Sequence, residues 1–303
     1  MTMNNYLITV VGATAIGKTA LSIKLAQHFK ADIISSDSRQ FYKEMKIGTA
    51  VPTNDELASA KHHFIQNRSI FDNYSVGQFE KDALQKLNQL FKTNNVAVMV
   101  GGSGLYTNAV INGLDYFPEV DPNIRITLNK EIENGNIENL KNQLKELDLL
   151  SYNSIEIENP HRLVRALEIC IGTGKTYSEF KNKAKEKRNF TAIKVGLTAD
   201  REIMYNRINK RVDIMMNEGL LEEVSKLHQH KSLNALQTVG YREIFEYLDE
   251  KISLEKAIEE IKKNTRRFAK RQVTWNKKDL DINWFDFECD SSEIITKVES
   301  LIV

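Results

Sequence analysis

The chain has 303 residues, of which 41% are hydrophobic and 27% charged, and its formal net charge is +1. This composition is typical of a soluble globular protein with room for one large α/β domain and a smaller one. It excludes a membrane span, because no run of about 18 apolar residues occurs, and its near-neutral charge leaves nucleic-acid binding open. Two distant cysteines without metal-ligand spacing and a start without a signal-peptide pattern predict reduced thiols and a cytoplasmic location.

Four short apolar segments are predicted to be strands: Tyr6–Val11, Ala31–Ser36, Asn95–Val100 and Ile193–Leu197. The first is a continuous apolar run rich in β-branched residues, a pattern typical of a central parallel strand covered on both faces. Helical spacing follows it in residues 19–29. Strands that alternate with longer helical segments indicate βαβ crossover units around a parallel sheet. In such a sheet, we expect the functional groups to gather at the carboxyl ends of the strands.

The pattern changes between residues 115 and 189, where apolar strands disappear and helical segments span residues 123–134, 137–148 and 160–172. We predict that this region is a helical insertion domain in an α/β core formed by residues 1–114 and 190–303. After Ala199 the core is predicted to be mostly helical, with a final amphipathic stretch near 291–303. The basic segment 175–190 is interpreted as a solvated loop or, alternatively, as an arm that contacts a phosphate backbone.

One motif follows the first predicted strand directly, Gly12-Ala13-Thr14-Ala15-Ile16-Gly17-Lys18-Thr19, and it matches the pattern GxxxxGK[ST]. Its glycines let successive backbone N–H groups point at one anion, and the helix N-terminus adds positive partial charge. Lys18 supplies a full charge, and the Thr19 hydroxyl is a ligand for Mg²⁺. We therefore predict a P-loop that binds a pyrophosphate or triphosphate group, in a P-loop nucleoside-triphosphate-hydrolase-like parallel sheet flanked by helices. The motif does not specify the reaction.

A single carboxylate, Asp37, follows the second predicted strand. P-loop hydrolases usually hold Mg²⁺ with an acid at the end of another strand. Here the strand Val96–Val100 runs instead into Gly101-Gly102-Ser103-Gly104, which has no acid. Asp37 is therefore interpreted as a group near Mg²⁺, as a general base that faces a second substrate, or as a helix cap.

The segment Ser35-Ser36-Asp37-Ser38-Arg39-Gln40-Phe41-Tyr42, joined to this P-loop, resembles the tRNA dimethylallyltransferases, also called tRNA isopentenyltransferases. Further family-like motifs occur in the family's order, so that the resemblance covers residues from about 7 to 275: Gly48-Thr49-Ala50 with Pro52, His62-His63, Gly101–Tyr106, Asn159–Glu168, Arg207–Asp213, Gly240–Glu243 and Ala269–Trp275. Three positions differ from the family's usual residues: Ser103 replaces Thr, His161 replaces Gln, and Phe41 replaces Val. Ser103 keeps the hydroxyl group, and Phe41 is a packing change.

The resemblance implies an enzyme that transfers a dimethylallyl group from dimethylallyl diphosphate to the exocyclic N6 of the adenosine next to the anticodon of tRNA. Pyrophosphate is the leaving group, and Mg²⁺ is the implied cofactor. The expected partners are the anticodon stem-loop of tRNA and dimethylallyl diphosphate, with no membrane, and the expected state is a monomer. The alternative interpretation is a P-loop small-molecule kinase, for which the strand ending in Gly101-Gly102 lacks the second metal-binding acid.

The resemblance also assigns roles to residues. Asp37 is implied as the general base, with Ser103 and Arg125 as further catalytic residues. The implied diphosphate-binding residues are Gly12, Ala13, Thr14, Ala15, Ile16, Gly17, Lys18, Thr19 and Arg207, with Arg201 and Arg211 as weaker candidates and Thr19 as the metal ligand. The implied tRNA-binding residues are Asp37, Ser38, Arg39, Gln40, His161, Arg162, Leu163, Val164 and Arg165. For Arg201, Arg207 and Arg211, surface ion pairing with Glu202, Asp213 and Glu218 is the alternative. For Arg125, the alternative is an arginine on a helix surface.

A run of basic residues independently favours RNA contact. Residues 262–278 contain eight lysines and arginines and no acid. Such a run is usually a solvated helix face, but in a chain that is nearly neutral overall it favours a phosphate-contacting surface.

Overall fold

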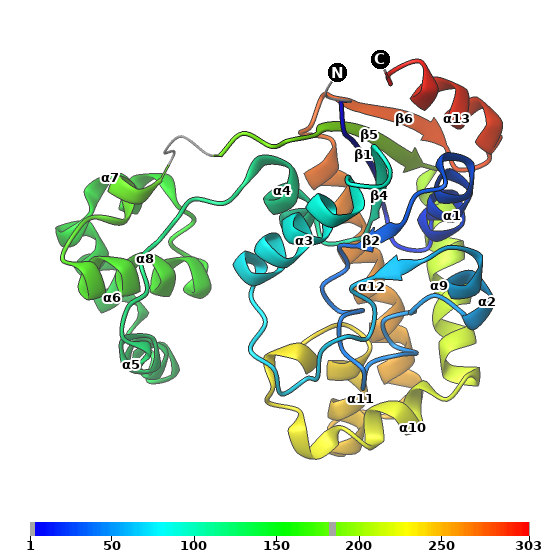
Figure 1. Cartoon of the computed structure of the whole chain (residues 1–303). Helices are drawn as coiled ribbons and strands as arrows, with labels where there is room; N and C mark the ends of the chain where they lie inside the picture. The colour runs from blue at the N-terminus through cyan, green and yellow to red at the C-terminus, as the bar shows by residue number, and fades with distance from the viewer. Residues whose placement is uncertain (1–3, 182–185, 303) are drawn as a thin grey trace. The chain divides into compact units, whose positions relative to one another are not determined.

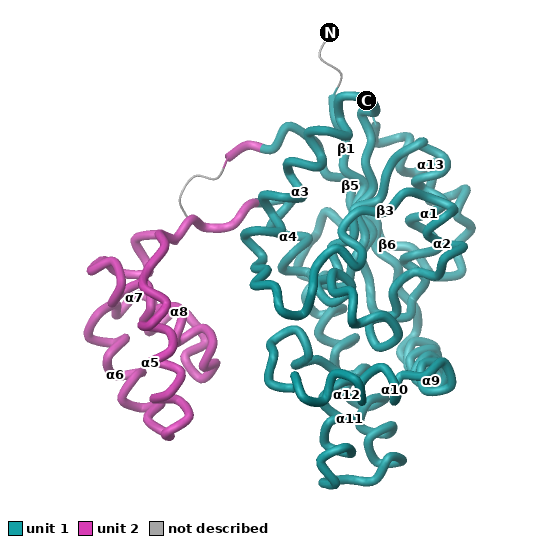
Figure 2. Tube along the Cα trace, turned by 60° about the horizontal axis from the view of Figure 1, so that its bottom comes forward, with its two compact units in different colours: residues 1–112, 188–303 teal, residues 113–187 magenta. Residues whose placement is uncertain are grey.

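The computed structural model describes residues 4–181 and 186–302. The chain divides into two compact units, unit 1 formed by Met1–Asn112 with Arg188–Val303 and unit 2 formed by Gly113–Lys187 (Figure 2). Unit 2 is inserted into the sequence of unit 1. Residues 182–185 of the predicted insertion and of its basic segment lie outside the described residues.

Unit 1 is built on a six-stranded sheet with the order β3-β2-β4-β1-β5-β6 (Figure 1). All of its neighbouring strands pair in parallel. The strands are β1 (Tyr6–Gly12), β2 (Ile33–Ser35), β3 (His62–His63), β4 (Val96–Val100), β5 (Thr191–Thr198) and β6 (Ile282–Asp286). The four predicted strands and the α/β fold class are confirmed. The two edge strands, β3 and β6, were not predicted, because neither carries a buried apolar run.

Helices cover both faces of this sheet and continue beyond its carboxyl edge. They are α1 (Lys18–Phe29), α2 (Asn54–Ser59), α3 (Val76–Leu90), α4 (Gly104–Asn112), α9 (Arg201–Asn217), α10 (Leu220–Ser225), α11 (Tyr241–Leu248), α12 (Leu254–Asn276) and α13 (Ser291–Glu299), with the short 3-10 helices η2 (His228–His230) and η3 (Asn234–Leu236). None of the helices in the described part of the chain has the length and apolar character needed to cross a membrane.

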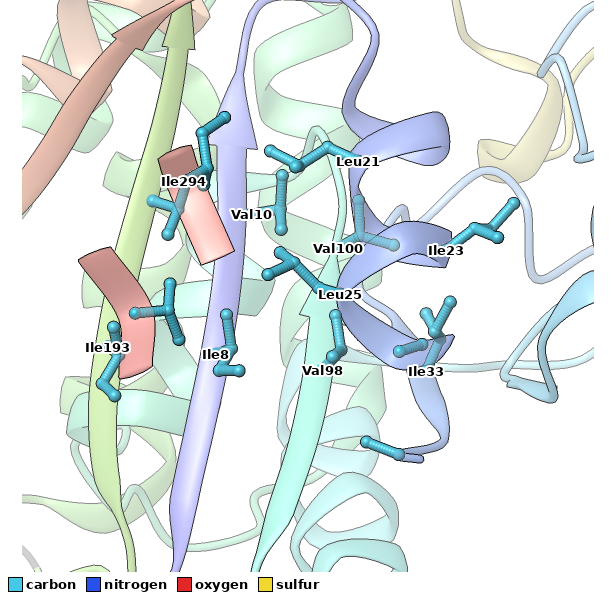
Figure 3. Close-up of a cluster of buried hydrophobic side chains, with 14 of the residues drawn as sticks. Ile8, Val10, Leu21, Ile23, Leu25, Ile33, Val98, Val100, Ile193 and Ile294 are labelled. Atoms are coloured by element: carbon cyan, nitrogen blue, oxygen red, sulfur yellow. The ribbon is translucent and has the colours of Figure 1, made fainter. Parts of the chain in front are cut away.

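The strand β1 is buried on both faces, as its continuous apolar pattern predicts. On one face Ile8 and Val10 pack with Leu21 and Leu25 of α1 and with Ile294 of α13 (Figure 3). On the other face, the core joins strand residues to α3 and α4 and includes Leu7, Met99, Phe79 and Phe41. The Phe41 ring stacks on Phe79 with centroids 5.2 Å apart. Phe41 is therefore a packing residue, as the sequence suggested.

Unit 2 is a small bundle of helices with a core of its own. Its elements are α5 (Pro122–Glu133), α6 (Ile137–Leu147), α7 (Leu149–Ser154), α8 (Pro160–Thr173) and the 3-10 helix η1 (Tyr177–Phe180). The three predicted helices correspond to α5, α6 and α8. Leucines from α5, α6 and α8 form the buried cluster. The helix α8 begins with proline at its first position after Asn159, whose side chain accepts a hydrogen bond from the His161 N–H, which is favourable helix-start chemistry.

The chain re-enters unit 1 at Arg188, beside the point where it leaves. The Arg188 guanidinium donates hydrogen bonds to the carbonyl oxygens of Ala109 (2.8 Å) and Val110 (2.9 Å) in the last turns of α4, and it pairs with Glu80. The helix α4 ends at Asn112, directly before unit 2. Arg188 therefore ties the returning chain to the departing one.

Candidate active site

The P-loop, residues 12–17, joins β1 to α1 and turns through backbone conformations that favour glycine. Gly12 has φ 142° and Gly17 has φ 110°. A β-carbon on Gly12 would lie 2.6 Å from the carbonyl oxygen of Leu197 in β5. The Lys18 ammonium donates a hydrogen bond to the carbonyl oxygen of Ala13 at 2.7 Å and so holds the loop in its curled form. Backbone geometry favours glycine at both positions, and at Gly12 the neighbouring strand also excludes a side chain.

A cavity of about 850 Å³ opens at this loop, and we call it the P-loop cavity. It is lined by residues 14–20 of the loop and α1, and by Arg207, Lys210 and Arg211 of α9. The Arg207 Nε donates to the carbonyl oxygen of Ala15 at 2.8 Å. Arg201 instead donates to the Tyr205 hydroxyl and lines another part of the surface. The predicted diphosphate-binding residues from Thr14 onward and Arg207 thus lie together around one cavity.

The Lys18 ammonium is partly buried, and its burial has an electrostatic cost. Burial lowers the pKa of Lys18 from 10.5 to about 8, an effect that Asp37 opposes and Arg211 reinforces. A bound anion would favour the charged form, since an opposite charge nearby stabilises it. Part of the binding energy of an anion would therefore offset the cost of holding this charge in place.

A second cavity of about 530 Å³ lies along α12, and we call it the α12 cavity. Its walls combine apolar and aromatic side chains with many polar ones. Among the lining residues are Ser38, Arg39, Ser103, Phe268, Arg271, Gln272 and Trp275. The volume falls within the range of roughly 300–1,000 Å³ that is usual for small-molecule sites.

Asp37 lines both cavities, as do Thr14, Gly102 and Arg211. Its Oδ1 accepts a hydrogen bond from the Arg39 N–H at 3.2 Å. Its Oδ2 lies so near Gly102 that a β-carbon there would be 3.3 Å away. The helix-cap interpretation of Asp37 is wrong, because a turn follows it and the next helix starts at Asn54. The carboxylate instead stands where the two cavities meet.

Ser103 holds the turn that follows Asp37. Its hydroxyl oxygen accepts a hydrogen bond from the Ser38 N–H at 3.1 Å and lies 3.0 Å from the Ser38 hydroxyl. These contacts need only a hydroxyl group, so serine serves them as well as threonine would. A catalytic role for Ser103 stays a prediction.

Arg39 and Gln40 are engaged within unit 1. The Arg39 guanidinium donates to the carbonyl oxygens of Asn234 (2.9 Å) and Ala235 (2.7 Å). The Gln40 amide donates to the carbonyl oxygens of Thr49 and Ala50. Arg39 lines the α12 cavity, whereas Gln40 lines the P-loop cavity. Both residues fix the walls of the site, and their contacts with tRNA stay predictions.

Comparisons with known proteins identify the family to which the chain belongs. A family model described as IPP transferase matches residues 40–279. The tRNA dimethylallyltransferases of Flavobacterium johnsoniae and Christiangramia forsetii are each 60% identical to the chain, over 96% and 99% of both lengths respectively. The chain belongs to the IPP transferase family.

Two solved structures support the same assignment. The full-length tRNA isopentenylpyrophosphate transferase of Bacillus halodurans has a TM-score of 0.72 and 34% identity, covering 98% of this chain and 95% of that one. A eukaryotic dimethylallyltransferase acting on tRNA has a TM-score of 0.80 and 28% identity, covering 98% and 77% respectively. The resemblance seen in the sequence is confirmed, and the chain is a prenyltransferase. The small-molecule kinase alternative has no support.

In unit 2 of this IPP transferase chain, two predicted tRNA contacts are corrected. Leu163 and Val164 on α8 are 0% and 3% exposed and belong to the core of the bundle. Their side chains therefore pack against neighbouring helices and are not available to RNA. His161 and Arg162 are exposed, and Arg162 pairs with Glu156 at 2.9 Å. Their contacts with tRNA stay predictions.

Arg125 and Arg165 share one carboxylate in unit 2. The Arg125 guanidinium donates to both oxygens of Glu168, at 3.1 and 2.6 Å, and Arg165 adds a third bond at 2.9 Å. Burial alone would raise the pKa of Glu168, but these hydrogen bonds hold it below its ordinary value. Arg125 is exposed on α5, as the helix-surface alternative has it, and its catalytic role stays a prediction.

The basic run 262–278 falls largely within α12, but it is not one uniform charged face. Lys262 pairs with Asp213 of α9 at 2.9 Å, and Lys263 pairs with Glu260 one turn earlier. Arg266 donates to Asn209. Arg271, in contrast, lines the α12 cavity. The acids lie outside the run in sequence, so the sequence count did not reveal this pairing. RNA contact by the second half of the run stays a prediction.

Two residues of the site were not assigned roles from the sequence. Gln272 lies in a family-like motif and links the P-loop to Gly102 through its amide. Glu223 on α10 accepts hydrogen bonds from the N–H groups of Ile47 (2.7 Å) and Gly48 (3.0 Å) and from the Tyr241 hydroxyl (2.7 Å). This carboxylate holds the Gly48-Thr49-Ala50 segment that lines both cavities. Glu223 had no sequence signal.

The P-loop cavity suits a metal ion that is held mainly by the phosphate oxygens of a bound diphosphate. Within residues 4–181 and 186–302, no group of three or more His, Cys, Asp or Glu side chains is arranged to hold a metal. The cavity does contain the Thr19 hydroxyl and the carboxylates of Asp37, Glu56 and Glu218. Mg²⁺ commonly binds in this way, through one or two protein oxygens, phosphate oxygens and water. These residues therefore fit a Mg²⁺ ion that arrives with a diphosphate.

Proposed function

We propose that the chain transfers the dimethylallyl group of dimethylallyl diphosphate to N6 of the adenosine next to the anticodon of tRNA and releases pyrophosphate. One observation carries the proposal. Asp37 lines two cavities at once, one formed by the P-loop with Arg207 and the other by α12 with the aromatic rings of Phe268 and Trp275. A transfer between two substrates needs such a junction, with a proton acceptor where they meet.

The donor diphosphate occupies the P-loop cavity in this proposal. As the bond between C1 and oxygen breaks, negative charge grows on the departing pyrophosphate and the allyl carbon becomes cationic. Lys18, Arg207 and the N–H groups of the loop stabilise that growing charge most strongly in the transition state. A Mg²⁺ ion at the Thr19 hydroxyl would supply further positive charge to the pyrophosphate oxygens.

The acceptor adenine enters the α12 cavity after it leaves the stack of the anticodon loop. Bases splayed from RNA loops commonly stack on aromatic side chains, and Phe268 and Trp275 provide such surfaces here. The N6 lone pair forms the new bond to C1, and the nitrogen then loses a proton. Asp37 accepts that proton on its carboxylate, which restores the neutral amine.

The test is transfer of label from dimethylallyl diphosphate to unmodified tRNA. The variant Asp37→Ala should lower the transfer rate by about 10²- to 10⁴-fold, the range for a lost general base. Its affinity for tRNA should change by less than about threefold. The control is Asp55→Ala, because Asp55 is an exposed acid on α2 outside both cavities. Equal losses of transfer and tRNA affinity would contradict the role of Asp37, and absence of transfer by the unaltered protein would refute the proposed function.

A further inference from the structure

A single side-chain amide, that of Gln272, joins three parts of unit 1. Gln272 lies on α12 and is 7% exposed. Its Oε1 accepts a hydrogen bond from the Thr14 N–H at 2.8 Å, and its Nε2 donates to the carbonyl oxygen of Gly102 at 2.9 Å. A backbone N–H only donates and a carbonyl only accepts, so these partners fix the orientation of the amide.

The two partners belong to two different segments of the site. Thr14 is part of the P-loop, and Gly102 lies against the Oδ2 atom of Asp37. A β-carbon on Gly102 would lie 2.6 Å from the Gln272 Nε2, so the glycine lets the amide and the carboxylate approach one backbone position. The amide therefore links the anion-binding loop to the segment that borders the carboxylate.

We propose that Gln272 is a positioning residue that fixes the separation between the diphosphate held by the P-loop and the carboxylate of Asp37. This inference rests on the proposed function. Gln272 takes no part in bond making or proton transfer. Its effect is geometric, because reacting groups that shift by about 1 Å can lose roughly 10²-fold in rate. Without the amide, each substrate still binds, but the separation between the donor carbon and the Asp37 carboxylate is no longer fixed.

The first test is Gln272→Met, which keeps the length of the side chain and removes both hydrogen bonds. The turnover rate should fall by roughly 10- to 100-fold, while the dissociation constants of dimethylallyl diphosphate and of tRNA change by less than about threefold. Single-turnover transfer and equilibrium binding measure these quantities separately. The matched control is Gln27→Met on α1, which removes an exposed hydrogen bond from the side-chain amide to the Ser59 carbonyl oxygen, away from both cavities.

The second test, Gln272→Glu, separates positioning from packing by its pH dependence. An ionised glutamate accepts from the Thr14 N–H but cannot donate to the Gly102 carbonyl, whereas a protonated one does both. Titratable and charged groups line the two cavities from several elements: Asp37 and Arg39 after β2, Lys18 on α1, Arg211 on α9, Arg242 on α11 and Arg271 on α12. Rates are therefore expressed relative to the unaltered protein at each pH. This ratio should rise as the pH falls from about 7 to 4.5, toward the ordinary glutamate pKa of about 4.3. The ratio for Gln272→Met should stay flat.

The outcomes separate this inference from the proposed function. If the unaltered protein transfers label and Gln272→Met keeps its turnover rate within about threefold, the positioning role is refuted while the proposed function stands. A loss of binding that matches the loss of rate, or a flat pH ratio for Gln272→Glu, also refutes it. If the methionine variant does not fold, the pH ratio of the glutamate variant decides. Absence of transfer by the unaltered protein overturns both proposals.

Discussion

Two segments with family-like motifs differ in how their residues are used. Residues 14–19 of the P-loop motif and residues 37–40 after β2 line the cavities, since backbone conformation and glycine positions dictate the shape there. The motif on α8 in unit 2 is helical, so its successive residues point to different faces of the helix. Leu163 and Val164 face the core, and Arg165 pairs with Glu168. A motif built on a loop therefore identifies a site more directly than a motif built on a helix.

The largest effect that tests this contrast is expected at Lys18. Lys18→Met removes the charge at the centre of the P-loop cavity, and transfer should fall by about 10³-fold, the upper range for one lost donor to a developing anion. The measurement is label transfer at saturating tRNA. Lys24→Met is the control, because Lys24 lies on the exposed side of the same helix and contacts Ser291. Transfer by Lys18→Met at the unaltered rate would mean that the loop does not hold the leaving group.

A smaller effect is expected on α8, and on stability rather than chemistry. Leu163→Ala leaves a cavity in the unit 2 core and should lower the free energy of unfolding of that unit by about 3 kcal/mol. Arg162→Ala, which removes only an exposed ion pair with Glu156, should change it by less than about 0.5 kcal/mol. Chemical denaturation measures both. If the two variants prove equally stable, the assignment of Leu163 to packing is wrong.

The smallest effect is a pH dependence of donor binding. Because burial lowers the pKa of Lys18 to about 8, the ammonium is charged at pH 7 and mostly neutral at pH 9. The terminal phosphate of a diphosphate ester completes its ionisation near pH 6, so the charge of dimethylallyl diphosphate barely changes in this interval. The affinity for dimethylallyl diphosphate should therefore fall by about tenfold from pH 7 to pH 9. Calorimetry measures this affinity, and the control is Lys18→Arg, whose guanidinium stays charged at pH 9. An equal fall of affinity in that variant would exclude Lys18 as the cause.

The features that the sequence predicted are those set by local pattern. The apolar runs of β1, β2, β4 and β5 and the glycines of the P-loop are visible without tertiary information. The edge strand β3 has only His62 and His63, and the half-exposed β6 lacks a continuous buried run. These strands form because a neighbouring strand offers unpaired backbone groups, which no local pattern records.

The same limit applies to the site. Asp37 was identified because it ends a strand beside the P-loop. The contact between Gln272 and Thr14 spans 258 residues along the chain, and that between Glu223 and Ile47 spans 176. Such contacts depend on how α10 and α12 pack. The motif that contains Gln272 was therefore visible in the sequence without its partners, and Glu223 was not visible at all.

The Arg188 contact has a consequence for how the chain accommodates its insertion. Since the guanidinium binds the last turns of α4, unit 1 holds the base of the insertion closed whatever lies between. The entropy of closing a loop grows only with the logarithm of its length, by about 0.6 kcal/mol per doubling. Helices gained or lost in unit 2 would therefore cost the sheet of unit 1 little stability. Unit 2 is thus free to change size while the catalytic core stays as it is.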